Sequence, residues 1–325
     1  PETLPLGNVS GGDAPAGRFA QALRALLTGL GLQEALTHSL AAPSTFDDPV
    51  QSSHRVRIRL ALSAELSGLR QALVPNLLDV LARNLRRGQA DVQLFEVGKV
   101  FALGEAKGGY DEARHVAAVL TGASAPRAWD NPAPPPADFF TAKGIVEALA
   151  AALHLPPPTF AAEGRPQMHP GRCAAVTVAG RTLGYVAEVD PDAVKSHLDV
   201  PPTVGRVAVF ELDADALLSL TSAARRYRPS PRFPAVSRDI NVVVDAATPY
   251  ALLEDIARAA ADPALTESVT LQSLYTGAPI PAGKKAVALR LTFRSESRTL
   301  TDADVDAQMD SVEKLLTERA HAERR

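Results

Sequence analysis

Apolar residues in the first part of the chain recur at two spacings, one typical of helices and the other typical of strands. Residues 17–31 and 73–88 repeat apolar side chains at helical spacing, so both predict amphipathic helices. Residues 56–62, VRIRLAL, alternate strictly between apolar and polar and predict a half-buried strand. The same patterns favour two neighbouring strands and a third helix in residues 92–103, 113–122 and 139–155.

A proline-rich loop and a run of strands complete this part of the chain. Residues 123–138, ASAPRAWDNPAPPPAD, hold too many prolines for a helix or a central strand and predict a surface loop. The stretches CAAVTVAG, TLGYVAEVD and RVAVFELD predict further strands. Helices and strands are mixed without regular βαβ alternation, so the sequence predicts an α+β fold.

The apolar periodicity stops at residues 219–234, where prolines cluster, and a compact unit follows. Its pattern predicts strand, helix, strand, strand and helix, in residues 239–245, 249–262, 268–275, 285–293 and 301–319. If the last residues pair as a short strand, the order βαββαβ is the ferredoxin-like split βαβ arrangement. We therefore expect two domains, residues 1–222 and 223–325.

Composition places the chain among ordinary globular proteins. Its 325 residues suit about two domains, and 46% of them are hydrophobic. The net charge of −3 means that an anionic partner has to meet a local patch. The single cysteine, Cys173, fits a reducing cytosol. No apolar run is long enough to span a bilayer, and the start at Pro1 in mid-phrase leads us to expect part of a longer protein.

Most enzyme signatures are absent from the sequence. The seven histidines form no HExxH or His-x-His motif, so a metal site has no support. No GxxxxGK[ST] motif occurs, and no GxGxxG motif follows a strand, so we expect no phosphate-binding loop. An acidic run could hold a cation, but its place in the first turns of a helix favours stabilisation of the helix dipole. The run consists of Asp302, Asp304, Asp306 and Asp310.

Positive charge is concentrated at one place in the C-terminal unit. Residues 226–325 contain 14 basic and 14 acidic residues, but residues 284–298 hold five basic residues and one acidic residue, a local charge of +4. The odd-numbered apolar residues of the predicted strand share one face, so Arg290, Thr292 and Arg294 share the other. RNA-binding modules of this topology use the face without helices, although a solvated surface carries the same residue types.

The candidate RNA-binding residues lie on this strand and around it. Arg232 and Arg238 stand just ahead of the first strand of the unit or at its start. They either contact RNA at the rim of the sheet or, in the case of Arg238, pair with a nearby acid. The complete candidate set is Lys284, Lys285, Arg290, Arg294, Arg298, Arg232 and Arg238.

Several motifs together carry a family resemblance. In the C-terminal unit they are Phe233-Pro234-x-Val236-x-Arg238-Asp239, Ile280-Pro281-x-Gly283-Lys284-Lys285 and Leu300-Thr301-Asp302. In residues 1–222 they are LARNLRRGQADVQLFEVGKVF, DFFTAKGIVEALAAALHL and HPGRCAAVTVAGRTLGYVAEVDP. The motifs of the C-terminal unit resemble the ferredoxin-fold anticodon-binding domain of the bacterial phenylalanine–tRNA ligase β subunit. The motifs of residues 1–222 resemble the catalytic-like module of the same subunit. The resemblance implies a class II synthetase-like antiparallel sheet with helices, followed by a ferredoxin-like domain.

The resemblance also implies a function and partners. The family forms a cytoplasmic (αβ)2 heterotetramer that charges tRNA with phenylalanine, using ATP and Mg2+. A working class II site clamps the ATP phosphates with two arginines. No arginine stands at the expected position near Phe95 and Glu96, and no glycine-rich segment ending in arginine follows in the module. We therefore expect a non-catalytic module that holds the α subunit, a C-terminal unit that binds the anticodon region, and no cofactor or metal bound by this chain.

Two other functions stay open at this point. A stand-alone split-βαβ RNA-binding protein would need no ligase partner, but it leaves residues 1–222 without a role. An acylphosphatase-like hydrolase on the same small fold would need a glycine-rich loop around phosphate, which the sequence lacks.

Overall fold

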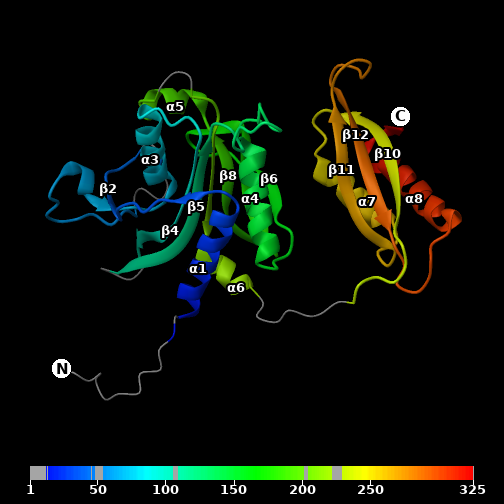
Figure 1. The fold of residues 1–325 in the computed structure, drawn as a ribbon, viewed down its shortest axis with the longest axis horizontal. Coiled ribbons are helices and arrows are strands. Elements are labelled where there is room, and N and C mark those ends of the chain that lie inside the picture. The colour runs from blue at the N-terminus through cyan, green and yellow to red at the C-terminus, as the bar shows by residue number, and fades with distance from the viewer. Residues whose placement is uncertain are drawn as a thin grey trace. The chain divides into compact units, whose positions relative to one another are not determined.

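The chain folds into two compact units, residues 1–225 and 226–325, in the computed structural model (Figure 1). The structure describes residues 12, 14–44, 46–47, 54–104, 109–200, 204–221 and 229–324. The expected domain boundary between residues 222 and 223 lies outside these ranges and stays a prediction.

A seven-stranded sheet forms the centre of the first unit, in the order β1-β4-β5-β9-β8-β7-β6. Neighbouring strands are antiparallel except β1 and β4, which are parallel. The strands are β1 (Gln33–Glu34), β4 (Val92–Leu103), β5 (Tyr110–Thr121), β6 (Thr159–Ala162), β7 (Met168–Val178), β8 (Arg181–Val189) and β9 (Val207–Asp213). A separate small sheet pairs β2 (Leu40–Ala41) with β3 (Gly68–Leu69).

Helices cover both faces of this sheet, because β4, β5, β8 and β9 bury apolar side chains on both sides. One face packs against α1 (Pro15–Gly29), α4 (Phe139–Ala152) and α6 (Ala214–Leu220). The other face packs against α3 (Val74–Arg86) and α5 (Pro191–His197). The helices expected at 17–31, 73–88 and 139–155 correspond to α1, α3 and α4. The strands expected at 92–103 and 113–122 correspond to β4 and β5.

The strand expected at residues 56–62 is wrong. In the described part of the chain, this stretch makes an isolated bridge between Arg57 and Gly68 instead of a strand, and the 3-10 helix η1 (Ala64–Leu66) follows. Leu60 is 82% exposed and Leu62 is 95% exposed. The alternating pattern is real, but no element in the described part of the chain covers its apolar side. This stretch forms an arm beside β2 (Figure 1).

The second unit has the ferredoxin-like topology that the sequence predicts. Its four-stranded sheet has the order β11-β12-β10-β13, and both helices lie on one face. The βαββαβ elements are β10 (Val236–Asp245), α7 (Tyr250–Ala260), β11 (Thr266–Tyr275), β12 (Lys284–Phe293), α8 (Asp302–Ala320) and β13 (Glu323–Arg324). The Thr301 hydroxyl and the Asp304 carboxylate cap the first turn of α8 reciprocally. The predicted α+β class and capping box are therefore confirmed.

None of the helices in the described ranges has the length and apolar character needed to cross a membrane.

Candidate nucleic-acid interface

The sheet of the second unit has one face against its helices and one face without them. On β12 the odd-numbered side chains Val287, Leu289, Leu291 and Phe293 are buried in the core, as the alternation predicts. The residues paired across the strands on the opposite side form what we call the open face. They are Ser237, Asp239, Asn241 and Val243 on β10, Ala286, Ala288, Arg290 and Thr292 on β12, and Ser268, Thr270, Ser273 and Tyr275 on β11.

Arg290 occupies the middle of the open face, where it is bound to a carboxylate of the neighbouring strand. Its Nε donates to Asp239 Oδ1 and its Nη2 donates to Asp239 Oδ2, both at 2.7 Å. The hydrogen bond from Arg290 lowers the pKa of Asp239 below its ordinary value. Asp239 therefore stays ionised and neutralises much of the positive charge that Arg290 brings to this face.

Arg294 continues the same side of the sheet beyond the end of β12. Its Nε donates to Glu267 Oε2 at 2.7 Å, and its Nη1 donates to the Phe233 carbonyl at 2.9 Å. The second bond ties the lead-in segment to the end of the sheet. Arg232, Glu267 and Arg294 also line a groove of about 810 Å³ with Pro229 and Pro231. The stretch before β10 is thus part of the surface of the second unit.

The remaining candidates lie in several places, so the structure does not bring all seven together. Lys284 pairs with Glu323 of β13 at 2.5 Å. Arg238 alternates with the open-face residues of β10 and so lies on the side of the helices. It pairs with Asp302 at the start of α8 at 2.6 Å, which is the acid pairing that the sequence offered as one of two interpretations. Arg298 pairs with Asp304 at 2.6 Å. Within the described residues, no carboxylate lies within salt-bridge distance of Lys285 or Arg232.

Folding changes the charge of the basic stretch 284–298. The sequence alone counts +4, from five cations and one acid. The fold adds four carboxylates, on Asp239, Glu267, Asp304 and Glu323, each bound to one of these cations. The four carboxylates therefore cancel the local charge of +4. The hydrogen bond from Arg298 and those from Thr301 also hold the pKa of Asp304 well below its ordinary value.

Tyr275 is an open-face residue that the sequence did not single out. It lies opposite Ala286 and is 48% exposed, and its hydroxyl donates to the Ala278 carbonyl at 2.8 Å. The register of β11 shifts between Leu271 and Ser273, and this irregularity moves Tyr275 to the open face. Simple alternation from Val269 would place it on the core side. An exposed aromatic ring on such a sheet is suited to stacking on an RNA base.

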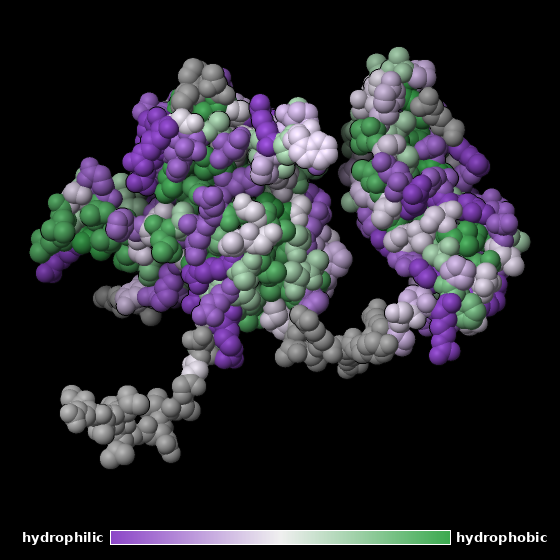
Figure 2. All heavy atoms as spheres, in the orientation of Figure 1, coloured by the Kyte–Doolittle hydropathy of each residue, from purple (hydrophilic) through white to green (hydrophobic). Residues whose placement is uncertain are grey.

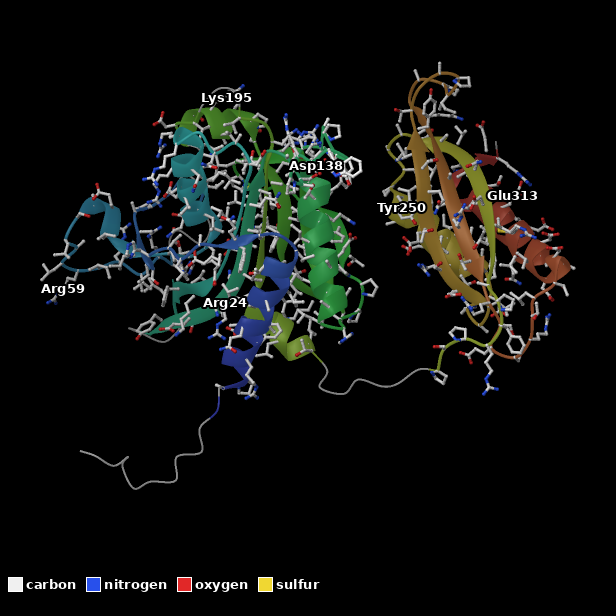
Figure 3. The ribbon with its side chains drawn as sticks, viewed as in Figure 1. Arg24, Arg59, Asp138, Lys195, Tyr250 and Glu313 are labelled. Atoms are coloured by element: carbon white, nitrogen blue, oxygen red, sulfur yellow. The ribbon has the colours of Figure 1, made fainter. Side chains whose placement is uncertain are left out.

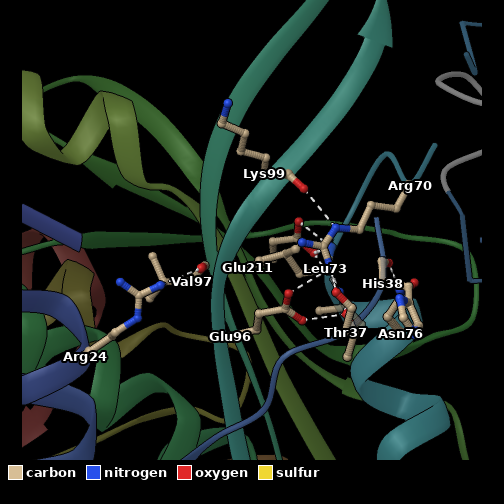
Figure 4. A network of polar contacts seen from close by, with 11 residues as sticks. Arg24, Thr37, His38, Arg70, Leu73, Asn76, Glu96, Val97, Lys99 and Glu211 are labelled. Carbon is tan, nitrogen blue, oxygen red and sulfur yellow. Dashed lines mark hydrogen bonds and ion pairs between the residues drawn. The ribbon is translucent and has the colours of Figure 1, made fainter. Parts of the chain in front are cut away.

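The first unit contains a buried polar network beside strand β4 (Figure 4). Arg70 Nη1 donates to Glu96 Oε1 at 2.8 Å, and both side chains are almost completely buried. Thr37 bridges them, since its hydroxyl donates to Glu96 and accepts from Arg70, each at 2.7 Å. Arg70 Nε also donates to the Lys99 carbonyl at 2.8 Å. The network joins the segment before α3 to strand β4.

Glu211 on β9 anchors the start of α3 to the sheet. Its carboxylate accepts the backbone N–H groups of Leu73 and Val74 at 3.0–3.1 Å, where the helix dipole favours negative charge. The same carboxylate lies 2.7 Å from Nδ1 of His115 on β5. Burial lowers the pKa of His115, but the hydrogen bond to Glu211 and the nearby acids outweigh burial and raise it.

The position expected to clamp ATP does not fit a phosphate group. Phe95 is fully buried in the core, and Glu96 is ion-paired with Arg70. The cation at this place therefore already has a carboxylate partner, and the carboxylate would repel a phosphate. In the described ranges, no group of three His, Cys, Asp or Glu side chains could hold a metal ion.

Comparison with known proteins agrees with the two units. Residues 1–214 match the model of the phenylalanyl tRNA synthetase beta chain CLM domain, and residues 231–325 match the ferredoxin-fold anticodon binding domain. A pyrrolysyl-tRNA synthetase from Desulfitobacterium hafniense superimposes with a TM-score of 0.45 at 15% identity, over 62% of this chain and 68% of that chain. A stand-alone RNA-binding module is not favoured, because it leaves the first match without a role.

Curated relatives named phenylalanine–tRNA ligase β subunit align with almost the whole chain. The Moorella thermoacetica protein is 37% identical, over 99% of this chain and 40% of its own length. The Symbiobacterium thermophilum protein is 38% identical, over 97% of this chain and 35% of its own length. The chain thus spans about two fifths of the length of these relatives. The family match over residues 1–214 and these identities show that the chain belongs to the phenylalanyl-tRNA synthetase β-chain family.

Proposed function

We propose that this chain supplies two functions of a phenylalanine–tRNA ligase: its first unit holds an α subunit, and its second unit binds the anticodon region of tRNA. The observation that carries this proposal is the consecutive match of one chain to a β-chain CLM domain and an anticodon-binding domain. The complete ligase is an (αβ)2 heterotetramer that works in the cytoplasm and uses ATP and Mg2+.

The open face is the part of the second unit that contacts RNA. Tyr275 offers a ring for stacking, and Ala286 and Ala288 leave the sheet between Tyr275 and Arg290 without bulky side chains. Arg290 has its Nη1 group free of Asp239, because Nε and Nη2 make the two bonds to the carboxylate. Such a surface suits the unstacked bases of an RNA loop better than a regular duplex. Arg294 and Lys284 lie at the two ends of β12, where each is paired with a carboxylate, of Glu267 and Glu323 respectively.

The first unit contributes assembly rather than chemistry. A phosphate clamp needs cations without local carboxylate partners, and Arg70 is bound to Glu96 inside the sheet. Catalysis therefore belongs to the α subunit. The chain on its own is expected to give no phenylalanine-dependent exchange of pyrophosphate into ATP, and exchange by the chain alone would overturn the assignment of catalysis to a partner.

Co-expression tests the proposal as a whole. The chain is expressed with the ligase α subunit of the same organism, purified through a tag on this chain, and assayed for phenylalanine attachment to tRNA. We expect the α subunit to copurify and the complex to bind tRNA more tightly than the α subunit does alone. Failure of the α subunit to copurify would reject the assembly role, and unchanged tRNA affinity would reject the role of the second unit.

A further inference from the structure

The arm of the first unit, residues 54–69, presents apolar side chains that nothing in the described part of the chain covers. Ile58, Leu60 and Leu62 are all exposed, and the two leucines almost completely so. Figure 2 shows the hydrophobic atoms of this region gathered at the edge of the unit, and Figure 3 shows Arg59 at the outer end of the arm. Scattered single apolar residues need no explanation, but a cluster of this kind marks an interaction site.

The base of the arm is held firmly to the unit. Arg55 is buried, pairs with Asp47 at 2.7 Å and donates to the carbonyls of Ala41 and Ala42 at 2.8 Å. Backbone hydrogen bonds join Ile58 to Ser67 and Leu69 to Val56 across the arm, each at 2.9 Å. A Cβ at Gly68 would lie 2.8 Å from Arg55 Nε, so the glycine allows this close packing. The arm is therefore anchored at its base while its apolar end stays uncovered.

The charges on the arm indicate what covers it. Arg57 and Arg59 alternate with the apolar residues, and both are exposed. The arm also carries one exposed acid, Glu65, but in the ranges that the structure describes no acidic side chain lies within salt-bridge distance of either arginine. The arm thus offers aliphatic anchors flanked by two unpaired cations, which complement an apolar pocket with carboxylates at its rim.

A groove continues this surface toward α3. It has a volume of about 900 Å³ and is lined by Glu65 of the arm, by Leu36 and Leu40 at and before β2, and by residues of α3 that include Asp79 and Arg83. Leu36 is 81% exposed. An exposed apolar side chain therefore also lines the groove that Glu65 of the arm borders.

We propose that the arm is a docking element for the α subunit, with Leu60 and Leu62 inserted into an apolar pocket whose acidic rim pairs with Arg57 and Arg59. This inference rests on the proposed function, because it names the surface through which the first unit holds its partner. A protein partner fits better than RNA: the exposed end, residues 57–62, has aliphatic side chains and no aromatic ring on which a base could stack. The position of the arm in the CLM-domain unit, rather than in the anticodon-binding unit, also points to the partner subunit.

Replacement of the two leucines tests the proposal. The chain with Leu60→Asp and Leu62→Asp, co-expressed with the α subunit, is expected to bind that subunit at least about tenfold more weakly than the unchanged chain. Thermal unfolding of the variant alone should match that of the unchanged chain, because both side chains are exposed. Leu252→Asp on α7, another exposed leucine, is the matched control and should bind the α subunit normally.

The outcomes separate this inference from the function on which it rests. If the unchanged chain binds the α subunit and the double variant binds it equally well, the docking role of the arm is wrong while the proposed function stands. If the double variant keeps the α subunit but loses affinity for tRNA, the partner of the arm is RNA and the proposal is overturned. If the unchanged chain itself fails to bind the α subunit, both are rejected. The double variant Arg57→Glu with Arg59→Glu should also bind the α subunit more weakly than the unchanged chain. Equal affinity would contradict the acidic rim of the pocket.

Discussion

Arg290 and Asp239 face each other on neighbouring antiparallel strands of the second unit and form a two-point ion pair, with both N–O distances 2.7 Å. The pair lies in the middle of the face on which RNA binding is proposed. A phosphate that approaches Arg290 meets the Asp239 carboxylate at the same place. The carboxylate thus limits how strongly this face attracts RNA and holds the guanidinium in a defined orientation.

Replacement of Asp239 should strengthen RNA binding. Asp239→Asn keeps the shape of the side chain but removes the negative charge, so Arg290 becomes a stronger partner for phosphate. We expect the Kd for tRNA to fall about two- to fivefold at low salt, the range that exposed charge pairs produce. Filter binding or fluorescence anisotropy measures this change. Glu254→Gln, which breaks a comparable ion pair with Arg258 on the helix side, is the control and should leave the Kd unchanged.

Reversal of the two open-face arginines should have the opposite effect. Arg290→Glu with Arg294→Glu places acids beside Asp239 and Glu267, so tRNA binding should weaken and its dependence on salt concentration should decrease. Titrations at several salt concentrations measure both effects. Arg258→Glu is a matched control, since the Arg258 side chain is 45% exposed, as Arg290 is, and also sits in an ion pair. If the double variant and the control bind tRNA equally well, the open face is a solvated surface that does not contact RNA.

The His115–Glu211 pair should make the stability of the first unit depend on pH. The pKa of His115 is raised in the folded state, so the pair stabilises the fold fully below the unfolded value near 6.5. This contribution is lost as the pH rises through the folded pKa. His115→Gln should therefore lower the Tm at pH 5.5 by about 2–4 °C, and the difference should shrink at pH 9. In a Glu211→Gln background the same substitution should show no such trend, and a trend that persists would contradict the pairing.

Gly184 should tolerate no side chain, whereas Gly180 should tolerate one at small cost. Gly184 has φ +153°, and a Cβ there would lie 2.0 Å from the Glu211 carbonyl oxygen on the neighbouring strand. Gly184→Ala is expected to destabilise the first unit by about 4 kcal/mol or more, because the backbone of β8 or β9 has to move. Gly180 has φ +78° but open space around it, so Gly180→Ala should cost only about 1–2 kcal/mol. Urea unfolding followed by circular dichroism compares the two, and similar losses would refute the steric explanation.

Much of the architecture follows from local pattern. The helical spacing in residues 73–88 reflects the burial of one face of α3 against the sheet. The strict alternation in residues 285–293 matches the buried and open sides of β12. Thr301 and Asp304 form the capping box that their spacing predicts. These features depend on side-chain periodicity and on neighbours within one turn, which a single segment carries.

The composition of the candidate interface depended on contacts between distant segments. The charge of +4 in residues 284–298 becomes neutral because Asp239, Glu267, Asp304 and Glu323 arrive from other elements. Tyr275 reaches the open face because the register of β11 shifts, which no count of alternating residues reveals. Residues 56–62 have the pattern of a strand, yet among the described residues no partner strand pairs with them along their length. Pattern therefore defines which side of an element is apolar, whereas strand pairing and long-range ion pairs define what that side meets.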